Sequence, residues 1–362
     1  MRKLVFLNDL QMSKLQVTAL VLLVSPLVQV QAQMPIQASS HAPIGVMGDH
    51  RHQQSETMFS YRFMDMNMTD NLQGSDSISP TEIVSTTPNA FAPPPTLRVV
   101  PIEMNTQVHM FGAMYAPIDS LTLMAMANYL EKSMDHITFQ GGAGTTELGR
   151  FTTRNTGLGD VKLAGLVKLL ESETQNWHLN LGLSLPTGSI DATDRVLTPS
   201  GATPELRLPY GMQLGSGTYD LEPGITYTGK SDQLGWGSQL RSIVHLGEND
   251  ENYTFGDSHQ LTSWASFSFS PAVSVSSRLT YQLSAGIDGR DQRIAAPVQT
   301  ADPANYGREA LLLGFGINTA GQSDGWRGHR LALEVSTPLM QDVKGVQLEM
   351  DTMITAGYQY TL

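Results

Sequence analysis

Imidazole and thioether side chains gather near the beginning of this sequence. Of the 18 methionines in the chain, 12 lie between residues 34 and 134, and histidines flank several of them. The densest stretch is 41–52, HAPIGVMGDHRH, whose donor residues are His41, Met47, His50 and His52. Thioethers suit Cu(I), and imidazole suits Cu(II) or zinc. The stretch therefore predicts a candidate soft-metal site, with copper as the candidate cofactor.

A second group of methionines follows an alternating pattern. In the run 56–68 four methionines fall on the face opposite Phe59, Tyr61 and Phe63, and a later run adds two more. The five proposed as soft-metal ligands are Met64, Met66, Met68, Met124 and Met126. If both runs line one interior, their thioethers form a ladder for a soft metal ion. Methionine also fills irregular apolar space. The alternative is that this stripe packs the N-terminal segment or lines an apolar permeation path.

The sequence offers little support for catalysis or for nucleic-acid binding. It has no cysteine, which removes thiol catalysis and thiolate metal sites. His178 shares a strand face with Asn180 and Ser184, but no GxSxG or HExxH motif is present. The formal net charge of −12 disfavours phosphate binding, which needs a basic surface. We therefore expect neither an enzyme nor a nucleic-acid partner.

The element that must position these groups is the stretch 157–189. Apolar residues recur there at every second position in two runs, 161–169 and 177–185, joined by the polar link 171–176. This period predicts two antiparallel strands. A soluble sandwich and a membrane barrel both produce such a hairpin, so the choice rests on the rest of the chain.

The beginning of the chain predicts export. Residues 17–30 form an apolar run that ends in Val30-Gln31-Ala32, so residues 1–32 resemble a secretory signal peptide, with translation starting at Met1 or Met12. The run is too short for a membrane-spanning helix, which needs about 20 apolar residues. Residues 33–55 are expected to form a periplasmic or lumenal His/Met segment. If the mature protein spans a membrane, residues 56–362 must form a closed barrel.

The remaining runs predict an all-β, transmembrane antiparallel barrel of about 12 strands. Short and long links alternate, as in the outer-membrane barrels of Gram-negative bacteria, which have short periplasmic turns and long extracellular loops. The last strand carries its alternation to Leu362, with Val346, Leu348, Ile354 and Tyr358 expected on one lipid-facing side. Such a strand resembles the C-terminal signal read by the barrel assembly machinery. The predicted location is the outer membrane, with its lipid as a partner.

Charged residues fall on the polar faces of these strands. Opposed acidic and basic groups inside a pore set a field that orients polar solutes; the alternative is that they pair and fill the lumen. The candidates are Asp160, Lys162, Lys168, Asp220, Glu222, Arg241, Arg278, Arg330, Glu334 and Glu349.

Several stretches resemble a known family. GLGDV at 157–161, LPTGS at 185–189, LGSGTYDLEPGITY at 214–227 and the segments MFGAMYAP and LTLMAMANY are similar to the outer-membrane transporter family named after the MetA pathway of phenol degradation. The resemblance covers roughly 56–362. It implies a secreted β-barrel for small molecules and brings no catalytic residues.

These observations together predict a porin-like barrel for the passage of a small-molecule solute. The resemblance and the methionine lining favour an apolar or aromatic compound. The rival is a barrel that binds or transports copper or another soft metal, and a structural barrel without transport is the further alternative.

Overall fold

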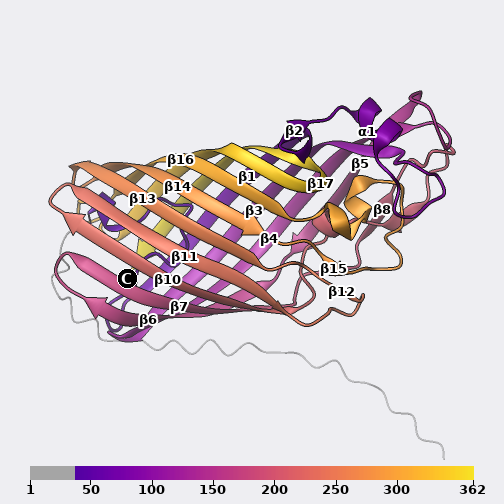
Figure 1. Ribbon diagram of the computed structural model, residues 1–362. Coiled ribbons are helices and arrows are strands. Elements are labelled where there is room, and N and C mark those ends of the chain that lie inside the picture. Colours follow the sequence, from indigo (N-terminus) through magenta and orange to yellow (C-terminus); the bar gives the residue numbers. More distant parts are fainter. Residues whose placement is uncertain (1–36) are drawn as a thin grey trace, which may run out of the picture. The chain divides into compact units, whose positions relative to one another are not determined.

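The computed structural model describes residues 37–362 (Figure 1). The predicted signal peptide, residues 1–32, lies outside them. Within the described residues no helix has the length and apolarity needed to cross a membrane.

A single antiparallel sheet closes on itself through pairing of its first and last long strands (Figure 1). The strand order is β17-β16-β14-β13-β11-β10-β7-β6-β4-β3-β1, with β17 returning to β1, β5 paired to β4 and the short β2 paired to β1. The predicted closed antiparallel barrel is confirmed. Its long strands are β1 (Thr57–Gly74), β3 (Val99–Ile118), β4 (Leu121–Phe139), β5 (Glu147–Leu158), β6 (Val161–Glu171), β7 (Gln175–Leu185), β10 (Tyr219–Ser231), β11 (Leu234–Leu246), β13 (Ser258–Ser270), β14 (Val273–Ser284), β16 (Arg308–Ala320) and β17 (His329–Thr361).

The two ends of the barrel differ in their connections. At the turn end, short links such as 119–120, 172–174 and 232–233 join the strands, and Leu362 lies there beside Thr57. At the loop end, long connections carry the remaining small elements: β2 (Asp76–Ser77), α1 (Pro80–Thr86), β8 (Thr193–Arg195), β9 (Glu205–Arg207), η2 (Tyr210–Met212), β12 (Tyr253–Thr254), β15 (Asp288–Gly289), η3 (Gln299–Ala301) and η4 (Pro303–Asn305).

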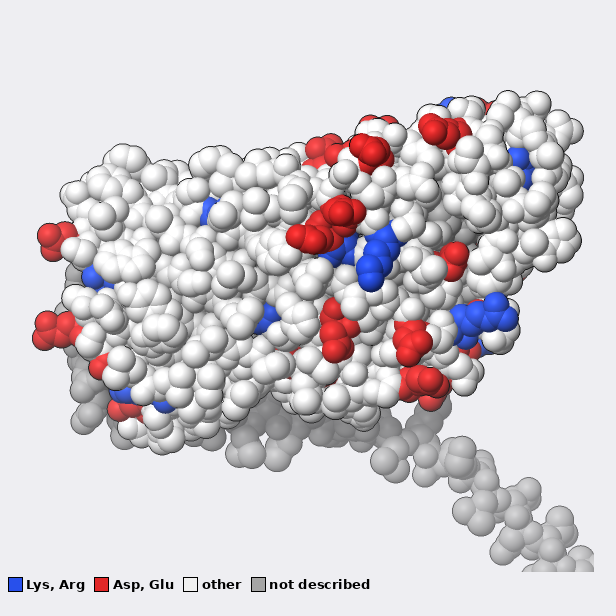
Figure 2. All heavy atoms as spheres, in the orientation of Figure 1, with Lys and Arg blue, Asp and Glu red and all other residues white. Residues whose placement is uncertain are grey.

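The strand faces have polar residues inside and apolar residues outside. Along β14, Ser276 and Thr280 are buried while Leu279 and Tyr281 are exposed. Figure 2 shows the consequence on one side: the wall nearer the turn end is almost uncharged inside its rim, and the charges gather at that rim and over the half nearer the loops. A sandwich buries its apolar face against a second sheet, whereas a membrane barrel turns it toward lipid. The alternation found in the sequence therefore reflects contact with lipid.

The loop end is more structured than the sequence predicted. β3 and β4 have 20 and 19 residues, beyond the roughly 9–11 that span a membrane, and β5 is an additional strand before the predicted run 161–169. Helix α1 begins at a Ser79 N-cap and buries Ile83 and Val84 against Val100 and Phe139. These apolar contacts stabilise the strand extensions.

The last strand changes its exposed face along its length. Ile354 and Tyr358 point outward as predicted, but Val346 and Leu348 are buried in apolar clusters near the loop end. Register shifts between Met66 and Met68 and again between Thr69 and Asn71 interrupt the pairing with β1. A bulge inserts an unpaired residue and so reverses the alternation. The expectation of one lipid-facing side for all four residues was therefore wrong.

Candidate functional site

An apolar cavity of about 310 Å³ lies at the loop end. Its wall combines three barrel strands, β3, β4 and β5, with two connecting loops. Strand residues contribute Phe151 and Thr153, and loop residues contribute Leu197, Leu208 and Ile294, among others. Ligand sites in proteins occupy roughly 300–1,000 Å³, and a cavity of roughly 150 Å³ lined by Leu, Ile and Phe holds benzene. The cavity is therefore large enough for a single-ring compound.

His136 is one of the polar residues in the cavity wall, with Thr153, Thr198, Arg207 and Arg293. His136 is 3% exposed, and its ring stacks on Phe151 with 4.6 Å between centroids and 6° between planes. Its Nδ1 is buried without a hydrogen-bond partner among residues 37–362. A buried polar atom that lacks a partner costs free energy, which a ligand that bonds to it recovers. His136 is thus positioned to bind the polar group of a solute.

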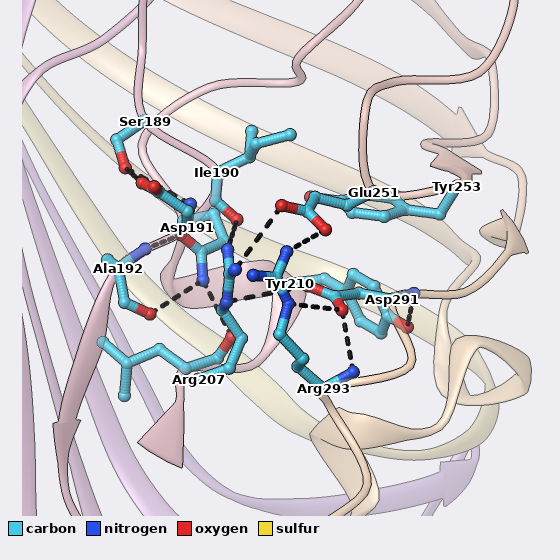
Figure 3. A network of polar contacts seen from close by, with 12 residues as sticks. Ser189, Ile190, Asp191, Ala192, Arg207, Tyr210, Glu251, Tyr253, Asp291 and Arg293 are labelled. Carbon is cyan, nitrogen blue, oxygen red and sulfur yellow. Dashed lines mark hydrogen bonds and ion pairs between the residues drawn. The ribbon is translucent and has the colours of Figure 1, made fainter. Parts of the chain in front are cut away.

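An ionic network fixes the two loops beside the cavity (Figure 3). Arg207 donates to the carbonyl oxygen of Ile190 at 2.9 Å, and its guanidinium lies 3.4 Å from Glu251 and 3.7 Å from Asp291. Arg293 also pairs with Glu251 and Asp291. Because Arg207 is almost fully buried, these bonds connect the 186–218 loop rigidly to the 247–257 and 285–307 loops.

Three glycine-containing motifs that were far apart in the sequence meet below the cavity. Asp160 accepts hydrogen bonds from the backbone N–H groups of Gly188 and Ser216, both at 2.8 Å. A Cβ on Gly215 would lie 2.5 Å from the carbonyl oxygen of Gly188, so only glycine permits this approach. The motifs GLGDV, LPTGS and LGSGTY therefore form one junction, at the break between β5 and β6.

Above this junction β5 pairs only with β4. β7 ends at Leu185, so the second edge of β5 has no strand neighbour within the described chain. The 186–218 loop covers it, with Asp194 accepting the backbone N–H of Arg154 at 2.8 Å. The cavity lies where this loop replaces a barrel strand.

The methionines of β1, β3 and β4 stand in rows across neighbouring strands. Near the turn end the register places Met58 opposite Met114, which faces Met124. Toward the loop end Met68 faces Met104, which faces Met134. Met104 and Met134 pack against Leu208, a residue of the cavity wall, so this second row lies next to the cavity. Met64 and Met66 lie between the rows, opposite Val108 and Thr106, and are therefore not neighbours of Met124 and Met126.

Five of the ten predicted lumen charges pair with one another, and most of the others bind different partners. Glu222 binds Lys162, 2.5 Å away, and also Arg241, while Arg278 binds Glu334. Asp220 lies 2.7 Å from His245. Asp160 accepts backbone hydrogen bonds at the junction described above. Lys168 pairs with Glu171 beside a short turn, and Glu349 interacts near the loop end with the charge of Arg308. This arrangement favours the alternative in which charges fill the lumen.

The N-terminal segment enters the barrel at the turn end and forms a plug, residues 38–52. Four barrel side chains hold its backbone: Arg330 donates to Ala42, Arg62 to Val46, Gln239 to Met47, and His178 bonds to Gly48, at 2.7, 3.2, 3.0 and 2.9 Å respectively. His178 is thus engaged by the plug, and Ser184 lies six residues further along β7, roughly 20 Å away for an extended strand. The two do not form a nucleophile–base pair.

The plug contains four of the nine predicted metal ligands, His41, Met47, His50 and His52. His41 and His50 lie side by side with Asp49, a residue that the sequence analysis did not select, and His52 stacks edge-on to His50. Burial lowers the pKa of His41 well below its ordinary value and also lowers the pKa of His52. Burial alone would raise the pKa of Asp49, but the neighbouring His50, His41 and Arg330 together outweigh burial and hold this pKa well below the ordinary value. His41 and His52 are therefore neutral near pH 7 and Asp49 is ionised.

No family model matches the sequence, and no curated protein matches it. Several solved structures do match the fold of this chain. An outer membrane channel from Pseudomonas putida F1 superposes with a TM-score of 0.57 at 13% identity, covering 88% of this chain and 99% of that chain. This chain has the fold of an outer-membrane channel.

Two further structures share the barrel more distantly. The Pseudomonas putida toluene transporter TodX aligns at a TM-score of 0.42 and 11% identity, over 90% of this chain and 96% of its own. The CymD monoaromatic hydrocarbon channel aligns at 0.41 and 10%, over 86% and 88%.

The loop residues of the cavity were not identified from the sequence. Leu197, Leu208 and Ile294 occur in segments rich in proline and polar residues, which were interpreted only as loops. The available signal was the presence of large apolar residues within them, because a solvated loop has little reason to carry such residues.

Proposed function

We propose that this protein is an outer-membrane channel for a small apolar or aromatic solute. The observation that carries the proposal is the 310 Å³ apolar cavity at the loop end, next to a row of inward-facing methionines. A solute held there meets Met68, Met104 and Met134 on its way inward. Thioether side chains are flexible and polarizable, so they accommodate ring-shaped molecules without a fixed geometry.

One polar group in the wall narrows the solute class. His136 carries an unpartnered nitrogen in a wall that is mainly apolar and also includes Thr153, Thr198, Arg207 and Arg293. An aromatic ring with one hydroxyl group satisfies that nitrogen and buries its remaining surface against Phe151 and Ile294. We infer that such a compound binds more tightly than its hydrocarbon analogue.

The junction around Asp160 supports membership in the phenol-degradation transporter family named above. Its residues come from the three motifs that carry the resemblance, and their contacts give those motifs a shared structural role. The likeness to the Pseudomonas putida F1 channel supports the same architecture.

We further infer that the barrel has twelve strand positions around its circumference. A closed sheet in which all neighbouring strands are antiparallel needs an even number of such positions. β17 is antiparallel to both β16 and β1, so its 33 residues must reverse direction and supply two of them. β5 and β6 pair with successive parts of β4 and together occupy one strand position. The strand that ends at Leu362 is the one we expect the barrel assembly machinery to engage.

Uptake measurements test the channel function. Ala296 lines the cavity, and Ala296→Trp fills it. Ala265→Trp introduces the same side chain on the exposed face of β13 and serves as the control. In porin-deficient cells expressing each variant, we expect entry of radiolabelled p-cresol to fall severalfold for Ala296→Trp only. Equal entry in cells with and without the wild-type protein contradicts the proposal.

A further inference from the structure

The plug forms a closed loop whose two ends meet at His41 and at Asp49-His50. Asp49 Oδ2 accepts the backbone N–H of Ala42 at 2.8 Å, and Val46 donates to the carbonyl oxygen of Pro43 at 2.9 Å within the loop. Both His41 Nδ1 and Asp49 Oδ1 approach the same atom, Nδ1 of His50, at 3.3 and 2.9 Å. Three donor atoms thus converge at the neck of the loop, all within 4.8 Å of one another.

These separations match the ligand spacing around one metal ion. Bonds of about 2.0–2.1 Å to nitrogen and oxygen place neighbouring ligands roughly 2.9 Å apart in square or octahedral geometry and roughly 3.3 Å apart in tetrahedral geometry. Two imidazole nitrogens that face each other also need a proton or a cation between them. One N–H on His50 shared between His41 and Asp49 meets that need, and a metal ion in the same position meets it with all three donors.

Two further observations point to a ligand. Nε2 of His50 and Nε2 of His52 are buried and lack hydrogen-bond partners among the described residues. The whole His52 residue is only 6% exposed, so solvent does not supply a partner. Beside Asp49 and His50 lies a separate cavity of about 20 Å³, whose opposite wall includes Met58, Met114 and Met124. A cavity above about 10–15 Å³ holds one water-sized particle.

We propose that His41, Asp49 and His50 bind one divalent copper ion at the neck of the plug. Two imidazoles and a carboxylate suit borderline metals, and copper(II) binds such donors most tightly among the first-row divalent ions. The ion joins both ends of the loop 41–50 and so holds the plug in its seated form. The site is a property of the plug and is independent of the solute that the channel passes.

Copper titration of the mature, untagged protein in detergent tests the site. We expect one equivalent of Cu²⁺ to bind, with nitrogen hyperfine structure from two imidazoles in the electron paramagnetic resonance spectrum. Loss of an outer-shell partner alone weakens metal binding by about 10–100-fold, so His41→Ala with His50→Ala should weaken it by at least about 100-fold. His259→Ala, on an exposed residue outside the site, should bind as the wild type does.

Heat-modifiable migration of the folded barrel on gels shows whether each variant folds. If the double variant does not fold, Asp49→Asn replaces it, because the amide retains the shape of the carboxylate and removes its charge. Absence of binding by the wild type overturns the proposal. So does a double variant with unchanged affinity and spectrum, or loss of the copper equivalent in His259→Ala.

Discussion

Arg278 on β14 and Glu334 on β17 form a buried ion pair beneath the plug. Nε of Arg278 lies 3.1 and 3.2 Å from the two carboxylate oxygens, and the residues are 6% and 1% exposed. Arg278 also donates to Thr280 at 2.8 Å. The pair bridges strands separated by β16 and provides a surface on which Gly45 of the plug rests.

Removing one partner of this pair should destabilise the barrel. Glu334→Ala leaves the Arg278 guanidinium buried without a counter-charge, and breaking a buried pair typically costs about 3–5 kcal/mol. Urea unfolding in lipid vesicles, followed by tryptophan fluorescence, measures the loss. Replacing both residues by methionine removes the uncompensated charge, so the double variant should recover most of the stability. A double variant as unstable as Glu334→Ala would show that the pair does not act as a unit.

Substitution of Gly45 should unseat the plug. A Cβ at this position would lie 2.5 Å from Oε1 of Glu334 and 2.6 Å from Nη2 of Arg278, closer than unbonded atoms tolerate. Planar-bilayer recordings should therefore show a larger or more frequent open conductance for Gly45→Val than for the wild type. Gly325→Val is the matched control, since nothing lies within 4 Å of a Cβ there. Equal conductance in all three proteins would mean that the plug does not close the pore.

Replacement of His136 by phenylalanine should change selectivity. The new ring retains the stacking on Phe151 and removes the nitrogen that lacks a partner. One hydrogen bond contributes about 0.5–1.5 kcal/mol, so p-cresol entry should fall by about 2- to 13-fold while toluene entry stays unchanged. Parallel uptake assays give the ratio. A proportional loss for both compounds would indicate a change of cavity shape instead.

A positive charge on the outer wall should be costly. Leu333 is 44% exposed and lies across from Ile317, in the apolar band of the barrel. An arginine on the lipid face costs about 2–4 kcal/mol near the bilayer midplane. Leu333→Arg should lower the free energy of unfolding in vesicles by that order, whereas Ser323→Arg in the exposed turn 321–328 should leave it unchanged. Equal effects would argue against lipid contact at Leu333.

The sequence alone was sufficient for the class of fold. Its period of two records which side chains face lipid and which face the interior, and this signal is local to each strand. The predicted runs 161–169 and 177–185 lie within β6 and β7, and the alternation placed the methionines on one face of their strands. In a regular strand, the face to which one side chain points determines the faces of all the others, so this prediction needs no knowledge of distant contacts.

Only the tertiary structure decided how these faces combine. Register placed Met58 beside Met114 and separated Met64 from Met124, because pairing is set by contacts between whole strands. The plug bond from Arg330 to Ala42 spans 288 residues, and the junction at Asp160 joins three separate motifs. The cavity likewise arises where two loops pack together, and loop packing follows from the closed barrel that brings their ends together.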